Sequence, residues 1–148
     1  MTINTSIDAA AGRMFTMKVS DGNAPPTFLT IGGGKSLRLS INGAPVEISN
    51  SASGGWKEYL PGAGLKEMTA SLQGIFDSKT VGARKVWDAA FAVGVGGYIE
   101  AQIISGHGDY FVGVFVVESY ERSGDDGQAE QFSCTLKSHG QPSYVAAP

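Results

Sequence analysis

A glycine-rich run that ends in lysine and serine is the first segment of this sequence with the composition of a ligand site. Residues 32–36 read Gly-Gly-Gly-Lys-Ser after an apolar stretch, and in a phosphate-binding loop backbone amides and a lysine cradle a polyphosphate. Two features oppose that chemistry. The leading glycine of the motif would have to stand at Leu29, and the residues after Ser36 alternate like a strand where the motif requires a helix N-terminus. The segment therefore does not predict a nucleotide site.

The other reactive side chains are too scattered to form a metal or catalytic centre. His107, His139 and Cys134 lack the close, fixed spacing of preformed metal-ligand pairs. Asp125 and Asp126 stand between two glycines, where a hairpin turn with solvated acids accounts for them. The sequence has no Gly-x-Ser-x-Gly elbow that would select a nucleophile. We therefore expect no catalytic residue, no metal and no cofactor, and the chain is not predicted to be an enzyme.

Length and composition predict one compact domain. The chain has 148 residues, 42% of them apolar, which is enough for a core of domain size. We expect a single domain over residues 1–148, with short arms at about 1–12 and about 140–148. A net charge of −3, from 11 basic and 14 acidic residues, removes the positive surface that a DNA-reading protein needs. No apolar run approaches the ~20 residues of a membrane helix, so we expect no membrane insertion.

Most of the chain alternates apolar and polar residues with a period of two, which predicts strands. The clearest alternation covers residues 36–42, and Asn42-Gly43 suits a tight hairpin turn with residues 46–49 as the return strand. Further strands are expected at residues 15–19, 28–31, 66–76, 98–104, 110–122 and 132–137. The chain is therefore predicted to be mainly β. In the strand over residues 66–76, the apolar side chains share one face and Thr69, Ser71 and Gln73 share the other.

One segment changes from strand spacing to helical spacing. Val86, Trp87 and Phe91 recur with the period of an amphipathic helix. We predict that these three side chains anchor the helix to the core. The residues suited to begin or end this helix are Asp77, Ser78, Thr80 and Gly94.

Residues 50–64 form a long loop that combines glycines with aromatic residues. A loop of about fifteen residues inside a small domain is uncommon and is usually functional. Trp56 and Leu60 either pack back onto the core of their own chain or belong to a contact surface, because Trp and Tyr are enriched at binding hot spots. The candidate contact residues are Asn50, Gly54, Gly55, Trp56, Tyr59, Leu60, Gly62 and Gly64.

Several short patterns between residues 37 and 76 occur together as a set. They are Val46-Glu-Ile-Ser-Asn, Gly-Gly-Trp56, Leu60-x-Gly62-x-Gly64 and a strand ending Gly74-x-Phe76. This set resembles the major tail (tail tube) proteins of long-tailed bacteriophages, and gene transfer agents carry similar proteins. The downstream order is also similar to that family: one helix, then Gly113-x-Phe115-x-Val117-x-Ser119, then a final strand Phe132-Ser-Cys-Thr-Leu-Lys-Ser. The resemblance covers roughly residues 13–140.

The resemblance implies a β-sandwich or half-barrel subunit with one flanking helix, six copies of which form a hexameric ring with an inner β-barrel. Stacked rings would form the tail tube through which double-stranded DNA passes into the host without being bound. The loop after the first hairpin would reach the neighbouring ring, which makes residues 50–64 an inter-ring stacking loop. Thr69, Ser71 and Gln73 become candidates for facing the water-filled lumen.

The implied partners are further copies of the chain and other tail proteins, namely the tape measure, tail terminator and distal tail proteins. The implied location is the tail of the virion, with assembly in the host cytoplasm. Two alternatives remain open: a small β-barrel module that binds a ligand or partner, and a tube protein of a related secretion apparatus. Self-assembly distinguishes a tube subunit from a binding module.

Overall fold

Ten strands, one α-helix and two short 3₁₀ helices make up the regular structure that the computed structural model describes over residues 12–148, except 24–25, 32–33, 62–63 and 78. In chain order they are η1 (Gly12–Met14), β1 (Thr16–Ser20), β2 (Phe28–Thr30), β3 (Gly34–Gly43), β4 (Val46–Glu47), β5 (Tyr59–Leu60), β6 (Lys66–Ile75), α1 (Val81–Phe91), η2 (Gly94–Gly97), β7 (Tyr98–Ile104), β8 (Tyr110–Ser123), β9 (Gln131–Ser138) and β10 (Ser143–Val145). The prediction of a mainly β chain with one α-helix is confirmed. No helix in this part of the chain is long and apolar enough to cross a membrane.

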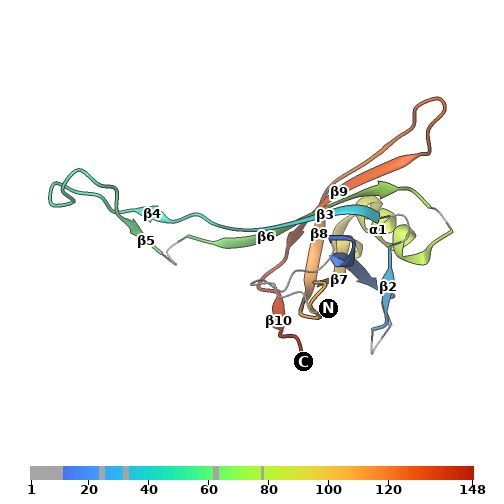
Figure 1. Ribbon diagram of the computed structural model, residues 1–148, viewed down its shortest axis with the longest axis horizontal. Coiled ribbons are helices and arrows are strands. Elements are labelled where there is room, and N and C mark those ends of the chain that lie inside the picture. Colours follow the sequence, from blue (N-terminus) through green and yellow to red (C-terminus); the bar gives the residue numbers. More distant parts are fainter. Residues whose placement is uncertain (1–11, 24–25, 32–33, 62–63, 78) are drawn as a thin grey trace, which may run out of the picture.

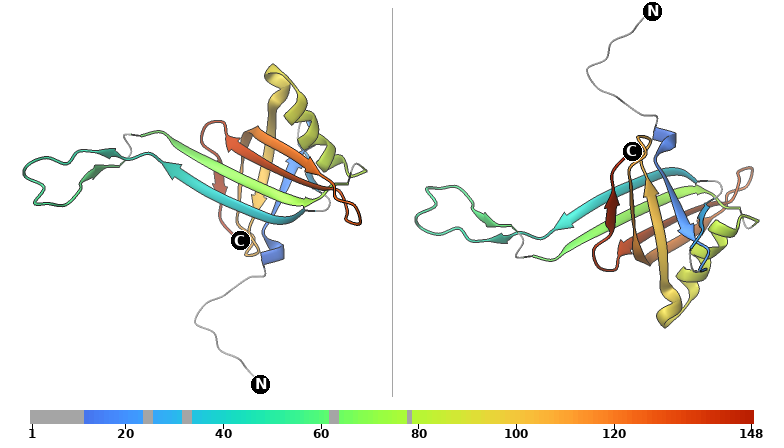
Figure 2. Two further views of the ribbon diagram at one scale, coloured as in Figure 1. Left: turned by 90° about the horizontal axis from the view of Figure 1, so that it is seen from above. Right: turned by 90° about the horizontal axis from the view of Figure 1, so that it is seen from below.

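Eight of the strands form one antiparallel sheet that curls around the core as a half-barrel (Figures 1 and 2). Its strand order is β2-β1-β7-β8-β9-β6-β3, with β10 paired to the first residues of β8. The long strand β8 serves two neighbours, because residues 110–116 pair with β7 and residues 115–123 pair with β9. A bulge between Val117 and Ser119 marks this change, as bulges do where a strand bends.

The hairpin turn predicted at Asn42-Gly43 is wrong. β3 runs through both residues and pairs along its length with β6, instead of with residues 46–49. The return strand shortens to β4, which pairs with β5 in a separate two-stranded sheet. The ladder with β6 contains nine residue pairs, from Gly34–Gly74 to Gly43–Lys66, and so many backbone hydrogen bonds outweigh the local turn preference of an Asn-Gly pair.

The core lies on the inner face of the curled sheet. The alternation predicted for β6 is confirmed, since Met68, Ala70 and Leu72 are buried while Thr69 and Ser71 lie on the opposite face. The largest fully buried side chains are Phe115, Ile103, Leu136, Val19 and Val86. Helix α1 covers part of this inner face, where it packs against β8, β7, β1 and β2.

Two of the three predicted helix anchors face the sheet. Val86 is only 1% exposed. Trp87 is partly buried, and its ring centroid lies 5.3 Å from that of Tyr120 on β8. The Arg122 guanidinium lies 4.3 Å from the ring centroids of both Trp87 and Phe76, a cation–π arrangement. This cluster holds α1 against β8.

The prediction that Phe91 is a core anchor is wrong. Phe91 is 76% exposed, and its ring packs on Trp87 of its own helix at a centroid distance of 5.6 Å. The physical reason is position, because α1 ends at Phe91 and the last turn extends beyond the sheet that it would need to cover.

The helix begins where predicted but without the predicted side-chain cap. Thr80 occupies the N-cap position, yet its hydroxyl donates to Asp77 Oδ2 at 2.9 Å instead of accepting from the helix. Asp77 also accepts from the Lys79 backbone N–H, which lowers the pKa of this carboxyl. The helix ends at Phe91, and Gly94, with φ +80°, lies at the start of η2. Ser78 lies outside the described residues.

The C-terminal residues carry more structure than their composition suggests. In the segment expected to be an arm, Tyr144 of β10 packs on Phe111 with ring centroids 5.0 Å apart. The Tyr144 hydroxyl donates to Asp109 Oδ2 at 3.0 Å, which lowers the pKa of Asp109. The expected N-terminal arm falls mainly on residues 1–11, outside the described part of the chain.

Candidate functional site

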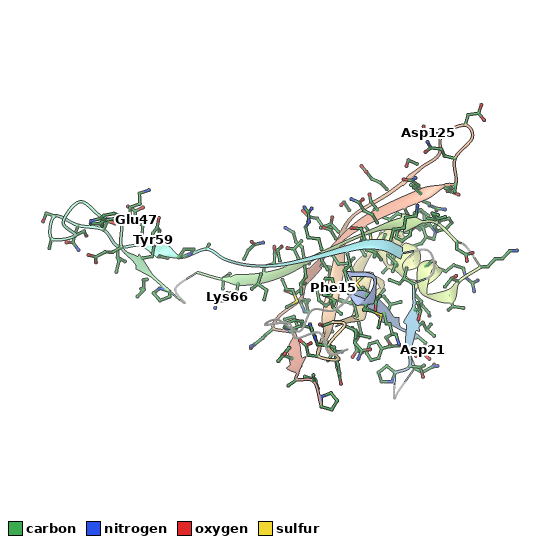
Figure 3. The ribbon with its side chains drawn as sticks, in the orientation of Figure 1. Phe15, Asp21, Glu47, Tyr59, Lys66 and Asp125 are labelled. Atoms are coloured by element: carbon green, nitrogen blue, oxygen red, sulfur yellow. The ribbon has the colours of Figure 1, made fainter. Side chains whose placement is uncertain are left out.

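The chain extends from its body in a long arm, defined here as residues 43–61 and 64–66 (Figure 1). β3 and β6 leave the body side by side, and β4 and β5 continue as the two sides of a hairpin. Figure 3 shows Glu47 and Tyr59, which are paired in register, near the far end of the molecule. The arm therefore holds the predicted stacking loop away from the core.

Local hydrogen bonds give the tip of the arm a defined shape without help from the core. The Asn50 side-chain oxygen accepts from the Ala52 N–H at 2.8 Å, and the Ser53 hydroxyl accepts from the Asn50 N–H at 2.9 Å. Gly54 and Gly55 have φ angles of +67° and +88°, which glycine adopts without steric cost. A tip that is already ordered loses less entropy when it binds a partner.

The aromatic and apolar side chains of the tip point into solvent. Trp56 is 82% exposed, and Tyr59 and Leu60 are about half exposed. The interpretation in which Trp56 and Leu60 pack back onto their own core is therefore wrong. An exposed tryptophan on an ordered projection suits a contact with another molecule. Gly62, another predicted contact residue, lies outside the described residues.

Gly64 lets the two sides of the arm approach each other closely. A Cβ atom at this position would overlap the carbonyl oxygen of Ala44 on the opposite side. Any other residue would have to push the two backbones apart. This glycine is therefore required by the arm itself, whatever the tip contacts.

The sheet has two long free edges, at opposite ends of one four-stranded section. This section has the order β8-β9-β6-β3, where β8 contributes residues 117–123. Along these residues β8 pairs with β9 on one side. On its other side the ladder with β7 stops at Val116, which pairs with Tyr98, the first residue of β7. β3 is the last strand of the sheet. Among the described residues, the outer backbone groups of both strands face no further strand, and such edges invite pairing with another chain.

The outer face of this four-stranded section is polar and rich in hydroxyl groups. Register places Thr69, Ser71 and Gln73 beside polar residues of β3 and β9. The residues that share the face are Ser36, Arg38, Ser40, Asn42, Glu67, Thr69, Ser71, Gln73, Ser119, Glu121, Ser133, Thr135 and Lys137. Positive charge is therefore sparse on it.

One cation of this face is held by two carboxylates. Lys137 Nζ lies 3.5 Å from Glu118 Oε1 and 3.5 Å from Glu67 Oε1. The negative charges of Glu118 and then Glu67 raise the pKa of Lys137 above its ordinary value. The lysine is thus neutralised within the chain, which leaves less positive charge to attract a polyanion.

The groups considered for chemistry in the sequence do not come together. Within the described ranges, no cluster of three or more His, Cys, Asp or Glu side chains suits a metal ion. Cys134 is buried, and burial raises the pKa of its thiol to about 12. Asp125 lies at the tip of the β8–β9 hairpin, exposed to solvent (Figure 3). Lys35 and Ser36 lie on the extended strand β3, while Gly32 and Gly33 lie outside the described residues.

Two features of this surface were missed by reasoning from the sequence. The first is which strands form the free edges, β3 and residues 117–123 of β8, because strand order cannot be read from alternation alone. The second is an exposed apolar segment between α1 and β7, with Val93 and Val95, which lies outside any periodic pattern. The sequence did contain a signal for the second feature. Val93 and Val95 are apolar, yet they belong neither to the apolar face of the predicted helix nor to an alternating strand.

Comparison with known proteins assigns these features to a family. The family model described as phage tail tube protein matches residues 9–144. No curated protein sequence matches the chain. Two chains from gene transfer agent particles have the same fold: one from the tail of an empty particle, refined with helical C6 symmetry, and one from a native virion.

The likeness extends over nearly the whole chain. The empty-particle tail chain is 27% identical with a TM-score of 0.76, and the native virion chain is 26% identical with a TM-score of 0.77. In both cases the match covers 93% of this chain and 100% of the other. The SPP1 tail tube subunit shares the fold at 12% identity and a TM-score of 0.67, over 92% of this chain and 78% of that one. The chain has a structural role in a tail tube and belongs to the phage tail tube protein family.

Proposed function

We propose that six copies of the chain close into a ring, that rings stack through the arm, and that double-stranded DNA passes through the resulting tube. The observation that carries the proposal is the four-stranded section with a free edge on each side and a polar outer face. The C6 symmetry reported for the tail of the gene transfer agent particle supports six copies.

The two free edges suit each other in direction. Each neighbouring pair in the order β8-β9-β6-β3 is antiparallel, so β3 and β8 run in opposite directions. A rotation about the tube axis keeps strand direction, and β8 of one subunit would then meet β3 of the next as another antiparallel pair. Repetition around a ring closes the barrel and covers both of these free edges.

The arm is the proposed contact between rings. Its tip is ordered and carries exposed Trp56, Tyr59 and Leu60, the residue types and preorganisation that favour binding. Because a contact between a tip and a different surface is heterologous, it extends in one direction and builds an open stack. Asn50, Gly54, Gly55, Gly62 and Gly64 shape this stacking loop.

The polar outer face is the proposed wall of the lumen, with Thr69, Ser71 and Gln73 at its centre. DNA has to slide along this wall without binding. Each phosphate contact with a lysine or arginine releases counterions and adds affinity, and Lys137 is already paired with Glu67 and Glu118. A wall rich in hydroxyl groups and poor in free cations therefore favours passage over retention.

The tube would work as part of a virion tail assembled in the host cytoplasm. A stack of heterologous contacts has two different ends, which suits two different end proteins, the tail terminator and the distal tail protein. The lumen would hold the tape measure protein before DNA passes. All of these roles are structural, and none of them needs a catalytic residue.

Electron microscopy of the purified chain tests the assembly. We expect rings or tubes when the chain is concentrated alone. A chain that stays monomeric at high concentration, and also with its tail assembly partners, would refute the proposal.

A DNA-retention assay tests the wall. Wild-type tubes should retain little double-stranded DNA, whereas Gln73→Lys tubes should retain it with a steep salt dependence, because log K falls by about 0.9 per neutralised phosphate for each unit of log salt. Gln73→Ser is the matched control without added charge. Strong, salt-sensitive retention by wild-type tubes would contradict this role of the polar face.

A further inference from the structure

Three large apolar side chains stand exposed at the corner between α1 and β7, and Phe91 alone of them has a ring contact, with Trp87 of its own helix. Phe91, Val93 and Val95 are 76%, 97% and 83% exposed. We call these three residues the apolar corner. Scattered apolar residues are normal on a protein surface, but three within five positions form a local apolar patch of the kind that marks a contact with another molecule.

The apolar corner lies beside the free edge of β8. The corner leads directly into β7, whose first residue Tyr98 pairs with Val116. The next residues of β8, from Val117 onward, have no strand on that side within the described part of the chain. The corner is also on the core side of the sheet, because α1 packs through Trp87 on Tyr120, and Tyr120 shares the core face with buried Cys134.

The other free edge carries an apolar row on the same side of the sheet. On β3, Leu37, Leu39 and Ile41 pair with the core-face residues Leu72, Ala70 and Met68 of β6. Leu37 and Leu39 are only partly buried, and Ile41 is 60% exposed. We call these three residues the β3 row. Their own chain therefore leaves part of this apolar surface open to solvent.

Corner and row lie on opposite sides of the body. In both views of Figure 2, α1 with its C-terminal end lies along one long side, and β3 lies along the other. One subunit cannot bring its own corner to its own row. In a ring of identical subunits each contact is heterologous, so a patch on one flank must meet a different patch on the other.

We propose that the apolar corner of one subunit packs beneath the β3 row of the next subunit in the ring. This inference rests on the proposed ring. When β8 of one subunit pairs with β3 of the next, the core faces of the two strands lie on the same side, and the corner at the β8 edge reaches under the neighbouring β3. The ring joint then has two layers: a backbone ladder toward the lumen and an apolar contact behind it.

Disulfide cross-linking tests this contact. The double variants Val93→Cys/Leu39→Cys and Val93→Cys/Ile41→Cys place one new thiol in the corner and one in the row. The native Cys134 is buried with a raised thiol pKa, so it adds little background. Oxidation of assembled rings should give a ladder of covalent oligomers up to the hexamer on a denaturing gel. The matched control is Val93→Cys/Val145→Cys, with the second thiol on β10, and it should give no ladder.

Charge substitution gives a second readout. Val93→Asp/Val95→Asp should raise the concentration needed for ring formation at least tenfold and leave the thermal melting curve unchanged, because both side chains are exposed in the single chain. Val95→Leu keeps the corner apolar and should assemble like the wild type.

The outcomes separate this contact from the ring itself. Tubes that form normally from Val93→Asp/Val95→Asp, or a ladder from the Val145 control but from neither β3 pair, would overturn the corner contact and leave the ring proposal standing. Failure of the wild-type chain to form any ring would overturn both. A ladder confined to the β3 pairs supports the contact.

Discussion

The two tryptophans give opposite predictions for stability and assembly. Trp56 is exposed at the tip of the arm, whereas Trp87 is partly buried between α1 and β8. Trp56→Ala removes no contact with the core, so the free energy of unfolding should change by less than about 0.5 kcal/mol. The melting temperature should then stay within about 2 °C of the wild type.

Assembly of rings into tubes should be far more sensitive to Trp56→Ala than the stability of the fold is. Truncation of a hot-spot tryptophan typically costs about 2 kcal/mol or more per contact, which is about 30-fold in an equilibrium constant. In the proposed tube, six such contacts act together at each junction of two rings, or roughly 12 kcal/mol if they add. Trp56→Ala should therefore give folded subunits, and rings, that do not stack into tubes at concentrations where the wild type does.

Trp87→Ala is the matched contrast. Full burial of a Phe or Trp makes its truncation cost about 3–5 kcal/mol, and the partial burial of Trp87 lowers this to roughly 2–3 kcal/mol. The melting temperature should fall by about 6–9 °C at about 3 °C per kcal/mol. Circular dichroism melting and negative-stain microscopy of both variants measure the two effects. A large loss of stability in Trp56→Ala, or normal tubes from it, would refute the reasoning.

Three further predictions follow from single contacts. Gly82→Ala should lower the free energy of unfolding by about 1–3 kcal/mol in chemical denaturation, because the added Cβ would overlap the Thr30 carbonyl oxygen. This loss is expected although alanine favours helices over glycine. Gly124→Ala is the control and should not destabilise the fold, because Gly124 has open space around it. Cys134 should react with a thiol reagent only on unfolding, and rapid labelling of the native chain would contradict its burial and its pKa of about 12. The Asp109–Tyr144 bond lowers the pKa of Asp109, so its stabilisation of β10 is present at neutral pH and is lost as pH falls below 3.8 through that lowered pKa. Hydrogen-exchange protection of β10 should drop over this pH range in the wild type. In Tyr144→Phe the protection at neutral pH should be lower, and its drop with acid should be smaller.

Local patterns predicted the strands and the helix because these depend on which residues are buried. The alternation over residues 66–76 located β6 and both of its faces, and the change of period located α1 with Val86 on its buried side. These features depend on neighbours two to four positions away, which the sequence displays directly.

Features that depend on distant partners were not predictable in this way. Asn42-Gly43 carries a strong turn signal, yet β6 pairs with β3 and holds both residues extended. Phe91 fits the apolar period of α1, but the sheet ends before it. The sequence indicated that Trp56 lies in an unusual glycine-rich loop. It did not show that the loop is held away from the core, because that depends on the arm formed by β3 and β6 together.

The continuity of β3 and β6 from the body into the arm has a mechanical consequence. Both are strands of ten residues, about 34 Å each at ~3.4 Å per residue. A pull on the tip runs along the strands, while the hydrogen bonds between antiparallel strands are perpendicular to them. Because both strands continue into the tip, such a load pulls β3 and β6 in the same direction and shears the ladder between β6 and β9 all at once, instead of unzipping it bond by bond. The same two strands that form part of the proposed lumen wall would therefore carry the tensile load between one subunit and the molecule that binds its tip.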